Sequence, residues 1–192
     1  MSPSDSPLAK LQGFLTGKGD TADPTGMTTD KFRQTMERTL SESATGNALL
    51  RYAAQQRIAV HIIQGKNMAG YIPENRAVYI AAAPILSTVP PEAVLALGAY
   101  LRQAQLQILG FKNPDESMTS LEKAVAFDSK MLDNITIMCK IASALYEKGQ
   151  PDFVDALARM GHGDMYSVFV EHGPGQHMTD VFYKTYIQTT DV

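Results

Sequence analysis

The residue types that most often bind metal ions gather near the end of the sequence. Imidazole and carboxylate side chains occur there within nineteen residues, at His162, Asp164, Glu171, His172, His177 and Asp180. Such groups are the usual donors of a catalytic zinc, which takes three protein ligands and leaves one position for water. One hypothesis is therefore a metal-dependent hydrolase with ligands from residues 162–180, in which His162, His172 and His177 bind the metal.

The spacing within this segment favours a different interpretation. The stretch from His172 to His177 contains two glycines and a proline, and such a stretch predicts a turn. A turn lacks the helical face on which two histidines four residues apart converge on zinc. We therefore favour a solvated loop at this place and expect no metal ion or other cofactor.

Nucleophilic catalysis has no recognisable motif in the sequence. The single cysteine, Cys139, lies in an apolar stretch, where a buried thiol behaves as a small hydrophobic group. His61 also stands among apolar residues, and we expect it to be packed and hydrogen-bonded. The sequence contains no Gly-x-Ser-x-Gly elbow, phosphate-binding loop or dinucleotide fingerprint. One cysteine cannot form an intramolecular disulfide, which is typical of a reducing compartment.

Helices and short strands must position these side chains. Capping residues and apolar periodicity predict helices that begin near residues 28, 45, 90, 117 and 151. Thr28 or Thr29 is the expected cap of the first helix and Thr45 or Asn47 of the second, while Pro90 and Pro91 suit the first turn of the third helix and Gly110 its end. The fourth helix extends to about residue 146, with apolar side chains three and four apart at Leu121, Val125, Leu132, Ile135, Cys139 and Ala142. The third is apolar on most sides and is expected to be central and buried. Short β segments at 58–63, 71–72 and 77–80 predict a small antiparallel sheet.

The first 27 residues differ in composition from the rest of the chain. Ser, Pro, Gly, Thr and Asp dominate them, which predicts a disordered N-terminal tail at 1–27 and one globular domain at 28–192. The tail is interpreted either as a terminus without a function or as a docking or secretion segment. The sequence does not separate these alternatives.

The order of the expected elements resembles a bacterial family of small zinc metallopeptidases. The segments that carry the resemblance are residues 48–51, 58–60, 70–80, 94–105 and 144–149. The resemblance implies an α+β fold, a mainly helical single domain with a small antiparallel sheet, similar to a minimal zincin-like scaffold.

The resemblance also implies a His-Glu-x-x-His motif on the buried helix. This sequence has Ala99, Tyr100 and Gln103 at the three chemical positions, and Met131 where the family's next helix supplies an acidic ligand. Alanine has no ligand atom, and a neutral amide is a poor donor for zinc. A phenol that titrates at about pH 10 does not replace the glutamate as general base. We therefore expect an inactive metallopeptidase homologue.

Asp128 interrupts the apolar stripe of the long helix, between Val125 and Leu132. A buried carboxylate needs a partner, because burying an unpaired charge costs on the order of several kcal/mol. One interpretation is a cap or a salt bridge at the edge of the core. The other is a remodelled binding site.

Composition limits the classes of partner. The chain has 17 Lys and Arg against 20 Asp and Glu, and no evident local cluster of Lys and Arg, which argues against nucleic acid. No run approaches the ~20 apolar residues of a membrane span, and the N-terminus lacks an export signal. We therefore expect a cytoplasmic protein with no membrane partner.

The hypothesis that follows is a non-catalytic, metallopeptidase-like module that binds a peptide or a protein. Its candidate binding residues are Tyr71, Tyr100, Gln103 and Asp128, and an extended peptide is expected to add to the sheet edge through main-chain hydrogen bonds. Two alternatives stay open. One is the metal-dependent hydrolase described above. The other is a structural or assembly subunit, for which ten methionines and eight tyrosines offer adaptable contact surfaces. The oligomeric state is not predicted.

Overall fold

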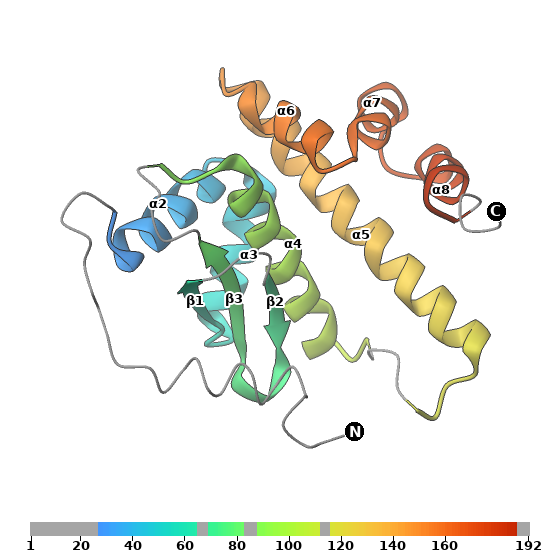
Figure 1. The fold of residues 1–192 in the computed structure, drawn as a ribbon, viewed down its shortest axis with the longest axis horizontal. Helices are drawn as coiled ribbons and strands as arrows, with labels where there is room; N and C mark the ends of the chain where they lie inside the picture. Colours follow the sequence, from blue (N-terminus) through green and yellow to red (C-terminus); the bar gives the residue numbers. More distant parts are fainter. Residues whose placement is uncertain (1–26, 65–68, 83–87, 112–115, 188–192) are drawn as a thin grey trace.

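The computed structural model describes residues 27–64, 69–82, 88–111 and 116–187. Within these ranges the protein is mainly helical and has one three-stranded sheet, an α+β arrangement (Figure 1). The elements in chain order are α2 (Thr29–Ser41), α3 (Ala44–Gln55), β1 (Ala59–Gln64), β2 (Ala69–Ile72), a 3-10 turn (Pro73–Asn75), β3 (Ala77–Ala82), α4 (Pro91–Ile108), α5 (Ser120–Tyr146), α6 (Asp152–Arg159), α7 (Gly163–His172), α8 (Gln176–Phe182) and a π-helical turn (Tyr183–Ile187). All but the last residue of the expected N-terminal tail lies outside the described residues.

Side-chain caps begin the first two helices. Thr28 accepts a hydrogen bond from the Lys31 N–H and starts α2 as expected. The cap of α3 is the buried Ser43, which accepts from the Gly46 N–H at 2.9 Å, so the expectation of a cap at Thr45 or Asn47 is wrong. A Cβ at Gly46 would lie 2.1 Å from the Leu40 carbonyl oxygen, so glycine is required where α3 begins against the end of α2.

The sheet is mixed, with strand order β1-β3-β2. β2 and β3 pair antiparallel across the turn that ends at Arg76, whereas β1 pairs parallel with β3 from Ala59 opposite Ala77. The expected antiparallel sheet is therefore wrong for one of its two pairings. The reason is the position of β1, which adds to the second strand of the hairpin and not to the first, and this reverses its direction relative to its neighbour.

The helix α4 is central and buried, as expected. Pro91 opens it, where a missing N–H costs no hydrogen bond, and Gly110 with φ of 95° follows its end. A Cβ at Gly98 would lie 2.3 Å from Cδ1 of Ile141, so the Ile141 side chain of α5 packs closely on α4 at a residue that has no side chain.

The long helix α5 begins with a complete capping box. The Thr119 N–H donates to the Glu122 carboxylate at 2.7 Å, and the Glu122 N–H donates to the Thr119 hydroxyl at 3.3 Å. Figure 1 shows α4 on one side of α5 and α6 to α8 on the other, while the first turns of α5 extend past both groups.

The last part of the chain is more helical than expected. Its apolar segments belong to α7, α8 and the π-helical turn, and the predicted loop between His172 and His177 is reduced to Gly173 to Gly175. α8 packs on α7 and on the π-helical turn, and it contacts α5 where the Thr136 hydroxyl lies 4.0 Å from the Met178 sulfur. Among the described helices, none has the length and apolar character that crossing a membrane requires.

Candidate functional site

The degenerate motif positions lie on the buried helix α4. Ala99 and Gln103 are buried and lie one turn apart on one face, whereas Tyr100 projects from another face and is partly buried. Burial raises the pKa of the Tyr100 phenol above its ordinary value, so this side chain is a neutral hydrogen-bonding group near neutral pH. Met131 is partly buried on α5. Of these four side chains, only Gln103 and Tyr100 offer a polar atom.

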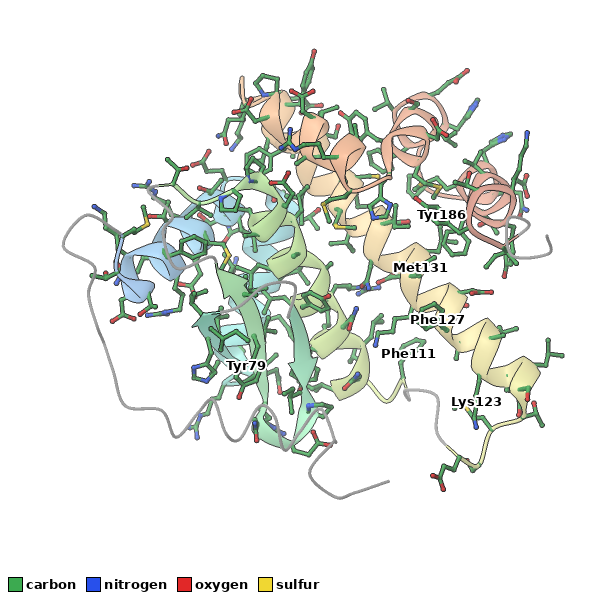
Figure 2. All side chains as sticks on the ribbon, viewed as in Figure 1. Tyr79, Phe111, Lys123, Phe127, Met131 and Tyr186 are labelled. Atoms are coloured by element: carbon green, nitrogen blue, oxygen red, sulfur yellow. The ribbon has the colours of Figure 1, made fainter. Side chains whose placement is uncertain are left out.

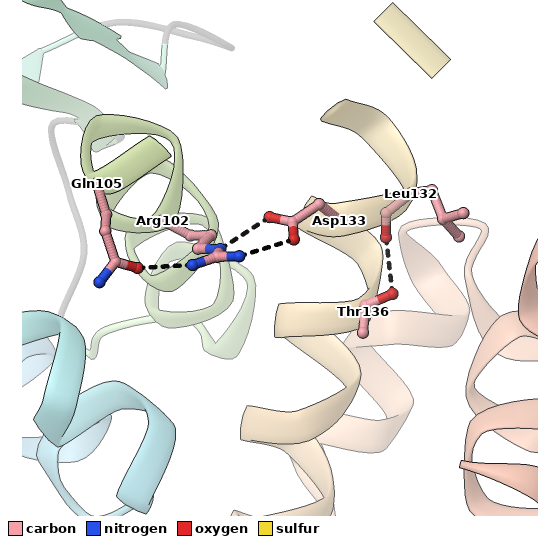
Figure 3. A network of polar contacts seen from close by, with 5 residues as sticks. All are labelled: Arg102, Gln105, Leu132, Asp133 and Thr136. Carbon is pink, nitrogen blue, oxygen red and sulfur yellow. Dashed lines mark hydrogen bonds and ion pairs between the residues drawn. The ribbon is translucent and has the colours of Figure 1, made fainter. Parts of the chain in front are cut away.

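A polar network ties α4 to α5 directly beside these positions (Figure 3). The guanidinium of Arg102 donates to both carboxylate oxygens of Asp133, at 3.1 and 3.2 Å, and to the Gln105 amide oxygen at 2.8 Å. Both ion-pair partners are nearly one-third exposed, so the pair contributes at most about 1 kcal/mol to stability. The bidentate geometry occupies the Asp133 carboxylate and fixes how the two helices meet.

The four candidate binding residues lie on three separate elements. Tyr71 is on β2, Tyr100 and Gln103 are on α4, and Asp128 is on the third turn of α5. No hydrogen bond or ion pair connects them within the described ranges. Asp128 forms neither the cap nor the salt bridge considered for it with any residue that the structure describes. It is partly buried, between the exposed Val125 and the partly buried Leu132.

The C-terminal histidines separate into two places. The Tyr186 hydroxyl donates to the Gly161 carbonyl at 2.7 Å. His162 Nδ1 lies 2.7 Å from the same hydroxyl, so the Nδ1–H of the ring donates to the hydroxyl oxygen. Burial lowers the pKa of His162, which favours the neutral ring. The rings of His172 and His177 stack at 4.2 Å on the surface. In the part of the chain that the structure describes, no three His, Cys, Asp or Glu side chains are grouped to hold a metal ion.

The other two chemically active side chains have different surroundings. His61 is exposed and stacks on Tyr79 at 5.2 Å, and it forms no hydrogen bond with another described residue, so the expectation of a packed, hydrogen-bonded ring is wrong. Its outward position follows from the strand alternation that directs Val60 and Ile62 to the core. Cys139 is buried as expected, and burial raises the pKa of its thiol to about 12.

A groove of about 670 Å³ lies between α2, α3 and the start of β1. Its lining residues are Arg33, Gln34, Glu37, Arg38, Ser41, Asn47, Leu50, Arg51, Ala53, Ala54, Ile58, Ala59 and Val60. Three arginines thus face one carboxylate, and Glu37 is already paired with Arg33 at 3.3 Å. Arg38 and Arg51 are exposed and have no ion-pair partner among the described residues.

Sequence reasoning missed this groove. The expectation that no basic residues cluster was wrong, because four of the seven arginines in the chain fall between residues 33 and 57. They are five or more residues apart in sequence, and the packing of α2 against α3 brings three of them together. The excess of arginine between residues 33 and 57 is the feature of the sequence that could have indicated this groove.

A second surface feature is apolar and lies where α4 ends and α5 begins. Five of the eight large hydrophobic side chains that are exposed in the described part of the chain gather there, namely Leu109, Phe111, Leu121, Val125 and Phe127. Figure 2 shows Phe111 beyond the end of α4 and Phe127 on α5. On α5, Leu121 and Val125 share one face, whereas Phe127 lies on another.

Searches for similar proteins returned no match: no protein-family model fits the chain, and neither the curated proteins nor the solved structures contain a significant relative. The resemblance to small zinc metallopeptidases therefore stays a prediction from the sequence.

Proposed function

We propose that this protein is a non-catalytic module that binds an acidic, extended peptide in the groove between α2, α3 and β1. The observation that carries the proposal is the concentration of three arginines on a groove of about 670 Å³ in a chain whose net charge is -3. Pockets of this size hold small ligands or several residues of a peptide. The arginines favour carboxylates, which they bind in bidentate pairs.

The position of β1 supports a peptide over other anionic partners. β1 is an outer strand of the sheet, and the Ala59 N–H donates inward to the Arg76 carbonyl at 2.9 Å. Because backbone groups of alternate residues point to opposite sides of a strand, those of Val60 and Ile62 point away from β3. An extended peptide beside β1 would pair with these groups while its carboxylates reach Arg38 and Arg51.

The absence of suitable donors at the motif positions supports a non-catalytic role. Ala99 and Gln103 stand where zinc needs two imidazoles, and Tyr100 stands where a general base is needed. The metallopeptidase-like, zincin-like character of the scaffold is part of this proposal and rests on the sequence resemblance.

The test uses a fluorescent hexapeptide of alternating valine and glutamate, with a valine-lysine peptide as its matched control. We expect the glutamate peptide to bind at least about tenfold more tightly than the lysine peptide in fluorescence anisotropy, since a lost charge-assisted pair costs roughly 1.5–3 kcal/mol. Arg51→Glu should weaken binding by about tenfold or more, whereas Lys184→Glu, which makes the same change in net charge on the exposed π-helical turn, should not.

Two further readouts separate the parts of the proposal. Methylation of the amide nitrogens on the peptide edge that pairs with β1 should abolish binding, because it removes the main-chain donors. Mass spectrometry after incubation with added zinc should recover the peptide uncut. Cleavage of the peptide, tighter binding of a single-stranded oligonucleotide, or equal binding by the Arg51→Glu variant would each contradict the proposal.

A further inference from the structure

The apolar stripe of α5 changes its surroundings along the helix. Leu121, Val125, Asp128 and Leu132 are spaced by four, three and four residues, so they lie on one face, and the same spacing continues to Ile135. From Ile135 to Ala142 the face is buried, but Leu121 is 74% exposed and Val125 is 51% exposed.

The covering of this face stops at α8. The contact between Thr136 and Met178 is where α8 contacts α5, and Figure 1 shows the first turns of α5 extending past α8. A further helix placed in line with α8 would meet Leu121 and Val125 as α8 meets Thr136. The uncovered surface therefore continues the part of α5 on which α7 packs and which Met178 of α8 contacts.

This surface is ready to bind without first having to fold. The capping box between Thr119 and Glu122 satisfies backbone donors of the first turn, so these turns are helical although few side chains pack on them. A preformed helix loses little conformational entropy when a partner binds.

Asp128 determines what kind of partner fits. Asp128 is partly buried and lies on the stripe between the exposed Val125 and the partly buried Leu132. Its carboxylate has no ion pair with a described residue, so a helix that covers the stripe must supply a cation or bury a lone charge. A second copy of this chain does not supply one. In a symmetric pair formed through this face, Asp128 meets only Leu121, Val125, Leu132 or the other Asp128, and none of these side chains carries a positive charge.

We propose that residues 121–132 of α5 bind an amphipathic helix of another protein that carries an arginine or lysine within its apolar face, opposite Asp128. Apolar anchors at i, i+3, i+4 and i+7 would cover Leu121 and Val125, and the buried charge pair would fix the register of the two helices. This interface is separate from the peptide groove, so either proposal can fail without the other.

The test uses two synthetic helical peptides with leucine at every core position except the central one. One peptide carries arginine at that position and the other carries glutamate. We expect the full-length protein to bind the arginine peptide at least about tenfold more tightly, and Asp128→Lys to reverse this preference. Asp155→Lys makes the same change of charge on α6 and should leave the preference as it is. Circular dichroism checks that each variant is folded.

A photoreactive benzophenone side chain at position 125 identifies the occupant. Illumination should link the protein to the arginine peptide and not to itself. Failure of both peptides to bind, equal affinity for the two, or no effect of Asp128→Lys would overturn the proposal. Efficient linkage between two protein molecules would assign the surface to a second copy, and linkage within the chain to residues 1–26 would assign it to that segment. Either result also overturns the proposal.

Discussion

The two halves of α5 carry the same spacing of apolar side chains in opposite surroundings. In the C-terminal half, Ile135, Cys139 and Ala142 are at most 1% exposed, because α4 and α6 to α8 pack on both sides of the helix. In the N-terminal half, Leu121 and Val125 follow the same spacing and face outward. An apolar stripe therefore specifies a face of a helix, and neighbouring elements decide whether this face belongs to the core or to an interaction surface.

The two halves also owe their helical structure to different forces. Tertiary packing holds the C-terminal half, where the close approach of Gly98 to Ile141 sets the distance to α4. The N-terminal half depends on local interactions, chiefly the capping box at Thr119. Changes to buried side chains should therefore affect the stability of the whole domain, and changes to exposed ones should affect binding.

The largest expected contrast is in thiol chemistry. The native Cys139 should be unreactive toward a disulfide reagent at about pH 8, because it is buried and its pKa is raised to about 12. A cysteine introduced by Val125→Cys should react at least about a thousandfold faster, since an exposed thiol titrates near pH 8.5. The coloured thiolate that the reagent releases on reaction measures both rates. In denaturant the two cysteines should react equally fast. Rapid labelling of the native wild type would show that the C-terminal half is not closed.

The next contrast is in stability. Leu145→Ala should lower the free energy of unfolding by about 2–5 kcal/mol, because it leaves a cavity at a fully buried position. Leu121→Ala should change it by no more than about 0.5 kcal/mol, since the side chain is already exposed. Denaturant titration of both variants compares the halves directly. A comparable loss in the two variants would show that the N-terminal half is covered in solution.

The smallest expected effect tests how closely α4 packs on the C-terminal half of α5. Gly98→Ala should cost about 1–3 kcal/mol of unfolding free energy, because the new Cβ meets Cδ1 of Ile141. Ile141→Val removes this methyl group and should cost about 0.5–1.5 kcal/mol by itself. The double variant should be more stable than the sum of the two losses predicts, as a double-mutant cycle measures. Strict additivity would mean that the helices do not meet at this glycine.

Local structure was largely predictable from the sequence. Thr28, Pro91 and Gly110 indicated the start of α2 and both ends of α4 correctly, because caps and helix breakers act through the backbone within a few residues. The cap of α3 was predicted wrongly, since Ser43 precedes the two polar residues chosen and its role depends on the contact of α3 with α2. The segment from 162 to 187 has glycines that indicated turns, but its helices depend on tertiary packing, of α7 on α5 and α6 and of α8 on α7.

The sequence by itself determined the helical character, the amphipathic face of α5, the burial of Cys139 and the lack of zinc ligands at residues 99 and 103, because these depend on side-chain type and on spacing along one element. Tertiary structure alone decided the parallel pairing of β1 with β3, the convergence of Arg33, Arg38 and Arg51 on one groove, and the place along α5 where the apolar face loses its cover. The physical reason is that each of these features depends on which elements become neighbours in space, and adjacency between distant segments is set by the packing of the whole core and not by any local pattern.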